Sequence, residues 1–171
     1  KGIMVIRDPR DICLSMLNHI KSRPHHYAFD TIYNNLSSRK KRLEAIIEGI
    51  KIKNTNGNRS FGNIEKMIKS MLPWEKSDDF IFLKFEQLVG PKGGGTKDGQ
   101  IQSIKKILSH LNVDRFDIPE IAENAFGSST TFRKGQINVW KTKLSIEEKE
   151  LFNKYDNFIS SLGYEPTGSF F

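Results

Sequence analysis

A short apolar strand that leads straight into a helix start is the feature that most constrains this sequence. Residues Gly2–Ile6 form a continuous apolar run, which predicts a strand buried on both faces of a parallel sheet. Asp8 then stands where a helix N-cap is preferred, Pro9 fits the first helical position, and Asp11 adds an acid to the first turn. Strand, tight turn and buried helix make half of a βαβ unit. The start of the chain therefore predicts an α/β fold.

The remaining elements are predicted from apolar spacing and turn residues. Residues 80–85 predict a second buried strand, and the apolar spacing over residues 30–52 predicts one or two helices. Further helices are expected over residues 64–71, from Thr96 onward, and after the capping box at residues 145–148. A surface turn is expected at residues 54–58 and a flexible loop at residues 91–95. No internal repeat is evident, so we expect one domain over residues 1–171.

Composition narrows the class of protein. The net charge of +7 favours an anionic partner, such as a nucleotide, nucleic acid or acidic lipid. One cysteine, Cys13, excludes an internal disulfide framework and suits a reducing compartment, which predicts a cytoplasmic protein. No apolar run approaches the roughly 18 residues of a membrane-spanning helix, so no membrane span is expected.

The first motif, Val5–Ser15, places a cation and a hydroxyl where one anion could meet both. Arg7 is expected at the carboxyl end of its strand, the edge at which open α/β sheets bind ligands. Ser15 follows the cap at Asp8 by about two helical turns and therefore lies on the same side of the helix. The planar guanidinium of Arg7 matches phosphate oxygens. The alternative is that Arg7 pairs with a carboxylate and Ser15 is a small packing residue.

The second motif, Phe132–Lys141, contains a further candidate phosphate site. Arg133 and Lys134 are two adjacent cations, and Gly135 lets the backbone approach a ligand closely. Asn138 is one of the few residues besides glycine that tolerates left-handed backbone geometry. Taken alone, this run could also be an exposed basic turn.

Together the two motifs resemble the 3′-phosphate-binding segments of the cytosolic-type sulfotransferases, which use 3′-phosphoadenosine-5′-phosphosulfate (PAPS). The second motif departs from the family pattern R-K-G-x-x-G-x-W-K at Asn138, which replaces the second glycine. The resemblance implies a three-layer α/β/α fold of the P-loop NTPase type with a mainly parallel sheet. It implies 3′-phosphate contacts from Arg7, Ser15, Arg133, Lys134 and Gly135, an anchoring role for Trp140 and Lys141, and structural roles for Arg10 and Asp11.

Phe85 and the glycine run at residues 93–95 are less specific signals. By resemblance, Phe85 takes the place of a tyrosine that helps to hold the adenine; the alternative is a core residue. The run Gly90–Thr96 follows a strand and precedes a helix, but it lacks the Gly-Lys-Ser/Thr ending of a Walker A motif. We therefore expect a connector there more readily than a phosphate site.

A basic run and a pair of histidines could also have a function. The basic run at residues 39–42 is typical of a solvated helix face, so no nucleic-acid contact is expected there. His25 and His26 are adjacent, but without a further ligand at metal spacing they do not predict a metal site.

The resemblance also implies a reaction. PAPS would be the donor, 3′,5′-bisphosphoadenosine (PAP) the product, and a small molecule, lipid or sugar hydroxyl, or an amine, the acceptor. The family's phosphosulfate loop and catalytic histidine precede the first motif, so the chain is expected to lack that N-terminal part. No catalytic base can be assigned, and residues 1–171 alone are expected to be inactive and poorly soluble.

Two other functions stay open at the level of sequence. The first is a P-loop-type nucleotide or small-molecule kinase, which an upstream Walker A lysine and Mg²⁺ dependence would indicate. The second is a non-catalytic basic module that binds nucleic acid, which a steep salt dependence on long polynucleotides would indicate. The oligomeric state is also open.

Overall fold

The structure is a computed structural model that describes residues 1–54, 57–125 and 135–170. The chain forms two compact units, each built from two stretches of sequence. The first unit contains Lys1–Arg7 and Met71–Val139, and the second contains Asp8–Ser70 and Trp140–Phe171. Both motifs cross from one unit to the other, between Arg7 and Asp8 and between Val139 and Trp140. The expected single domain over residues 1–171 stays a prediction.

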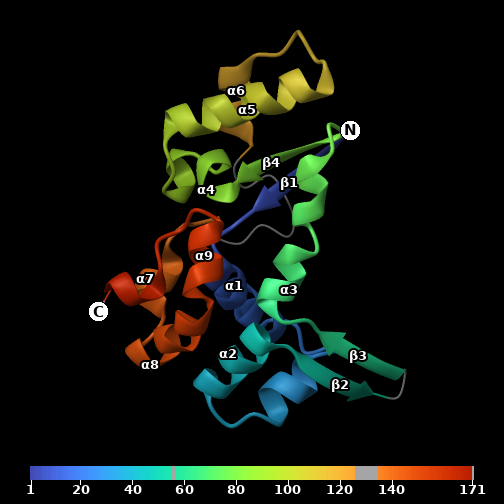
Figure 1. The fold of residues 1–171 in the computed structure, drawn as a ribbon, viewed down its shortest axis with the longest axis vertical. Helices are drawn as coiled ribbons and strands as arrows, with labels where there is room; N and C mark the ends of the chain where they lie inside the picture. Colours follow the sequence, from blue (N-terminus) through green and yellow to red (C-terminus); the bar gives the residue numbers. More distant parts are fainter. Residues whose placement is uncertain (55–56, 126–134, 171) are drawn as a thin grey trace. The chain divides into compact units, whose positions relative to one another are not determined.

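The first unit is built around a parallel pair of strands, β1 (Gly2–Ile6) and β4 (Phe80–Lys84) (Figure 1). Gly2 pairs with Phe80, and Ile6 with Lys84. The other elements of this unit are the 3-10 helix Leu72–Lys76, α4 (Phe85–Leu88), the 3-10 turn Pro91–Gly93, α5 (Lys97–Leu111) and α6 (Ile118–Asn124). The parallel pair, joined through a long helical crossover, confirms the α/β class.

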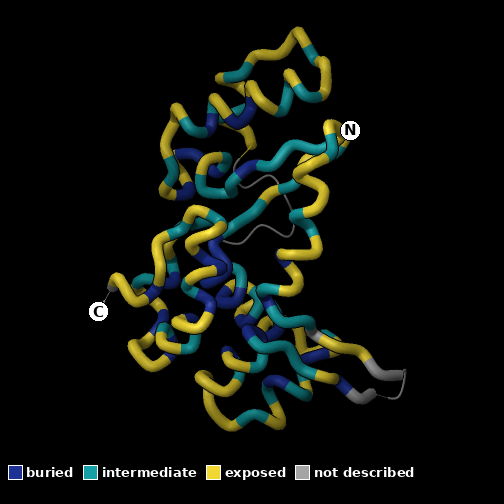
Figure 2. The backbone as a smooth tube through the Cα atoms, viewed as in Figure 1, coloured by how far each residue is buried: buried dark blue, intermediate teal, exposed yellow. Residues whose placement is uncertain are grey.

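The expectation that β1 is buried on both faces is wrong. Its residues alternate between half-buried and exposed along the strand (Figure 2), with Ile3 39% and Val5 43% exposed. Within the described part of the chain, β1 pairs only with β4. An apolar run gives a strand, but it does not tell how many of its faces are covered.

The second unit is mainly helical. It contains α1 (Pro9–Lys21), a π-helical turn (Asp30–Asn34), α2 (Arg39–Glu48), α3 (Ile64–Lys69), α7 (Val139–Lys143, from Trp140 on), α8 (Ile146–Lys149), the 3-10 helix Glu150–Tyr155, α9 (Asp156–Ser161) and the 3-10 turn Thr167–Phe170. Its core lies between these helices and includes Cys13, Leu17, Ile20, Leu43, Ile47, Phe152 and Ile159. The capping box predicted at Ser145 and Glu148 is confirmed. The single helix expected after it is divided into three short helical segments.

An antiparallel hairpin in the second unit was not expected. Strands β2 (Ile50–Asn54) and β3 (Gly57–Phe61) pair with Ile52 opposite Arg59. Gly49, with φ of 81°, ends α2, and the Ile-Lys-Ile-Lys sequence that follows alternates with the period of a strand. The helices expected up to residue 52 therefore stop at Glu48.

Candidate functional site

Arg7 occupies the predicted position at the carboxyl end of β1. The strand ends at Ile6, and the half-buried Arg7 follows it directly. Its Nη2 donates a hydrogen bond to the backbone oxygen of Gln136 at 2.7 Å. Its Cζ also lies 4.6 Å from the centre of the Phe85 ring, a distance at which a guanidinium and an aromatic face attract each other. The first and second motifs therefore meet in the first unit, through Arg7 and Gln136.

The turn at Gly135–Asn138 has two residues in the left-handed region. Gly135 has φ of 54° and Asn138 has φ of 57°. The expectation that Asn138 can take left-handed geometry in place of the family's glycine is confirmed. Arg133 and Lys134, the two predicted phosphate-binding cations of this motif, lie outside the described residues.

Phe85 lies next to Arg7 at the end of β4. It is the first residue of α4 and not the last residue of the strand, a difference of one position. The ring is half-buried and carries the Arg7 guanidinium over its face. Phe85 is thus neither fully buried in the core nor fully open, and the adenine contact implied by resemblance stays a prediction.

Ser15 belongs to the second unit, on α1. Its neighbours Cys13 and Leu14 are buried, whereas Ser15 itself is exposed. The exposure argues against the alternative that Ser15 is a packing residue. Its approach to the same anion as Arg7 stays a prediction.

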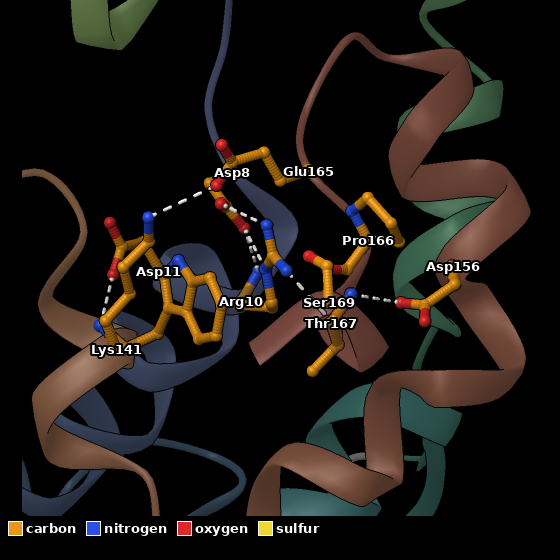
Figure 3. Close-up of polar contacts among 10 residues, drawn as sticks. Asp8, Arg10, Asp11, Lys141, Asp156, Glu165, Pro166, Thr167 and Ser169 are labelled. Atoms are coloured by element: carbon orange, nitrogen blue, oxygen red, sulfur yellow. Dashed lines mark hydrogen bonds and ion pairs between the residues drawn. The ribbon is translucent and has the colours of Figure 1, made fainter. Parts of the chain in front are cut away.

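Arg10 is a structural residue, as the resemblance implied. It is 1% exposed, and its Nε and Nη2 donate to the two carboxylate oxygens of Asp8 at 2.9 and 2.8 Å (Figure 3). Asp8 Oδ1 also accepts from the Arg10 backbone amide, so the same carboxylate caps α1. The Arg10 Cζ lies 3.7 Å from the ring centre of Trp140, which is completely buried. Arg10 is therefore held by its ion pair with Asp8 and by its contact with the Trp140 indole.

The C-terminal turn is tied to the same cluster. Arg10 Nη1 lies 3.2 Å from the hydroxyl of Thr167, which is 0% exposed. Asp156 accepts from the backbone amide of Thr167 at 2.6 Å, and Lys141 lies 3.3 Å from Glu165 (Figure 3). Trp140, buried against Arg10, thus anchors the end of the second motif, as the resemblance implied. Lys141 forms an exposed ion pair, and its anchoring role stays a prediction.

Each motif therefore contributes residues to two places: a buried structural cluster in the second unit and a candidate binding site in the first. Asp8, Arg10 and Trp140 form a buried structural cluster of the second unit. Arg7 and the Gly135–Gln136 backbone present a guanidinium beside a turn in the first unit. An arginine stays charged at all physiological pH values, and its planar fork can donate two bonds to phosphate oxygens. The chemistry available here is anion binding.

Two features of this site were not found from sequence. Gln136 occupies a variable position of the family pattern, yet its backbone oxygen receives the Arg7 guanidinium. The loop at residues 91–95, expected to be a flexible connector, is folded against the second motif: the Ile137 amide donates to the Gly93 oxygen at 3.0 Å. The glycine run after a strand indicated that this loop could approach another part of the chain closely. The sequence does not show which segment it approaches.

In the described ranges, no three His, Cys, Asp or Glu side chains are grouped as a metal site would need. The Cys13 thiol has a raised pKa, first because it is buried and second because of the nearby Asp8 carboxylate. Across the same ranges, no helix is long and apolar enough to cross a membrane.

Comparison with known proteins adds a family and a fold. The Sulfotransferase domain family matches residues 1–159 of the chain. No curated protein matches the sequence. Among solved structures, mouse sulfotransferase SULT7A1 complexed with PAP is similar with a TM-score of 0.61 at 19% identity. The match covers 94% of this chain but only 60% of the mouse chain. At this identity the likeness shows the fold, and the expected sulfotransferase-type α/β fold is confirmed.

Proposed function

The chain belongs to the sulfotransferase domain family, and on that premise we propose that it binds the 3′-phosphate end of a PAPS donor for sulfuryl transfer. The observation that carries the proposal is the Arg7 side chain at the end of β1, bonded to the backbone of Gln136. One cation from the first motif thus lies beside the turn of the second. The PAP in the mouse structure supports the same ligand class.

The residues of the two motifs fit the non-reacting end of this donor. We assign the 3′-phosphate to Arg7, Ser15, Arg133, Lys134 and Gly135, and one face of the adenine to Phe85. The positive φ of Gly135 gives a turn in which backbone and phosphate can approach closely. The net charge of +7 favours a ligand with several negative charges.

When bound, PAPS supplies the sulfuryl group, which passes to an acceptor hydroxyl or amine and leaves PAP. The residues named above hold a phosphate that does not react. Their contribution is binding energy and orientation of the donor relative to the acceptor. We assign no catalytic base. The acceptor is a small molecule, lipid or sugar, and the single buried Cys13 is consistent with a cytoplasmic location.

Calorimetry with PAP and 5′-AMP tests the proposal. The two nucleotides differ by the 3′-phosphate, whose charge-assisted contacts contribute roughly 1.5–3 kcal/mol each. We expect PAP to bind at least about tenfold more tightly than 5′-AMP. Equal affinities would overturn the proposal. Tight binding of long polynucleotides with a steep salt slope, and without preference for a 3′-phosphate, would favour a nucleic-acid-binding module instead.

A further inference from the structure

The glycine loop, Gly90–Gly95, joins α4 to α5 in the first unit and has a closed conformation. Its glycine amides donate within the loop: Gly93 to Gly90 O at 3.1 Å, Gly94 to Pro91 O at 3.0 Å, and Gly95 to Gly90 O at 2.8 Å. A loop that cradles phosphate points such amides at the ligand. Because these three amides already donate to carbonyl groups of the loop, they do not point at a ligand. The loop therefore does not have the conformation of a direct phosphate-binding loop.

The carbonyl groups of the loop accept hydrogen bonds from the second motif. The Gln136 side-chain Nε2 donates to Lys92 O at 2.8 Å. The Ile137 amide donates to Gly93 O at 3.0 Å. Two successive carbonyls of the glycine loop therefore hold two successive residues of the turn that receives Arg7.

The backbones of the two segments touch at Gly93, which is buried. A Cβ placed on Gly93 would overlap the backbone oxygen of Gly135 and a methyl group of Val89. Both obstacles are firmly placed, one in the backbone and one in a buried side chain. Glycine is thus required here so that the loop can approach the turn.

The loop is also fixed to the helices of its own unit. Thr96 caps the 15-residue helix α5 by accepting from the Gly99 amide. From the loop, Lys92 Nζ donates to Glu123 O at 3.1 Å, and α5 itself is joined to α6 by the bond from Gln100 Nε2 to Ala122 O, also at 3.1 Å. These two acceptors belong to α6. A loop held on α5 and α6 can act as a fixed support for a segment that packs on it.

We propose that the glycine loop is a positioning element for the 3′-phosphate site, with Gly93 and Gln136 as its positioning residues. The loop fixes the backbone of Gly135–Ile137, the Gln136 oxygen then receives the Arg7 guanidinium, and Arg7 is held for the phosphate. The inference rests on the proposed function, because it concerns the orientation of that site.

The variant Gln136→Ala tests the inference without changing the backbone carbonyl that Arg7 uses. It removes the hydrogen bond to Lys92 O, and losing one such bond is expected to weaken PAP binding about three- to tenfold. Binding of 5′-AMP should change less than about twofold, since the 3′-phosphate is absent. Amide exchange at Ile137 should become faster. Gln102→Ala, an exposed glutamine on α5, is the matched control and should change neither affinity.

Gly93→Ala is the second variant, and it should lower PAP affinity more strongly because the added Cβ displaces the Gly135 backbone. If it does not fold, Gln136→Ala still decides the matter. Unchanged PAP affinity and Ile137 exchange in Gln136→Ala would overturn the inference, as would equal losses for PAP and 5′-AMP. A wild-type protein that does not discriminate PAP from 5′-AMP would instead overturn the proposed function, and the inference with it.

Discussion

The backbone amide of Trp140 donates a hydrogen bond to Oδ1 of Asp11 at 2.9 Å, across 129 positions of sequence. Both residues are buried, at 0% and 2% exposed. Asp11 lies in the first turn of α1 and Trp140 begins the part of α7 that belongs to the same unit. This bond therefore fastens the end of the second motif to the helix of the first.

Replacing Asp11 tests how much this bond stabilises the fold. Asp11→Ala leaves the buried Trp140 amide without its acceptor, so we expect a loss of roughly 1–3 kcal/mol in the free energy of unfolding. Asp11→Asn retains an oxygen acceptor and should lose less. Urea unfolding of both variants measures the difference. Equal stability of Asp11→Ala and wild type would show that the contact is not needed.

The local elements of this fold could be predicted because their signals are local. Asp8 and Pro9 mark the start of α1, and Ser145 and Glu148 mark the start of α8. The β2–β3 hairpin was missed although Lys51 and Ile52 belong to a clear two-residue alternation. The helical spacing of apolar residues, with a period of 3.6 residues, was extended over residues 30–52. The change to the two-residue period of a strand after Gly49 was therefore not recognised. The exposure of Ile3 and Val5 depends on which segments cover β1. A local sequence pattern does not predict that covering.

The candidate site was predictable only where a side chain itself carries the chemistry. Arg7 follows from a cation at a strand end, and Asn138 from its tolerance of positive φ. Gln136 and Gly93 act through the backbone or through a missing Cβ. Their contribution depends on contacts between segments more than 40 residues apart, and neighbouring sequence does not predict such contacts.

The buried Asp8–Arg10 pair gives a second test of stability. Arg10→Met removes the cation and leaves the Asp8 carboxylate buried, which is expected to cost roughly 3–5 kcal/mol. Adding Asp8→Asn removes the buried charge and keeps a side chain that can cap α1. The double variant should therefore be more stable than Arg10→Met alone. A double-mutant cycle in urea with purely additive losses would contradict the expected coupling.

Arg7→Ala tests the role of Arg7 in ligand binding. It removes a charge-assisted contact to the 3′-phosphate worth roughly 1.5–3 kcal/mol, so PAP binding should weaken by about one to two decades. Binding of 5′-AMP should hardly change. Arg115→Ala, an exposed arginine of the same unit, controls for the loss of one positive charge. Similar losses for both nucleotides in Arg7→Ala would mean that Arg7 supports the fold and does not recognise the phosphate.

His26 predicts a modest pH dependence of stability. Its pKa is lowered from the usual value near 6.5, first by burial and then by the neighbouring His19 and Arg23 charges. Its Nδ1 accepts from the Ala28 amide at 3.2 Å, which requires that nitrogen to be unprotonated. The unfolded chain therefore takes up the proton first as the pH falls. The stabilisation is complete above about pH 6.5 and is lost as the pH falls through the lower pKa of the folded state.

Urea unfolding at pH 7.5 and 5.5 measures this dependence. The ring is half-buried, and screening by solvent should keep the effect of His26 on the free energy of unfolding below about 1 kcal/mol. His26→Gln should remove that part of the change in the free energy of unfolding, whereas His25→Gln, its exposed neighbour, should retain it. In wild type, the His26 ring protons followed by NMR should titrate below pH 6.5, and His19→Gln should raise that midpoint. A His26 midpoint at the usual value would contradict both the lowered pKa and the pH dependence derived from it.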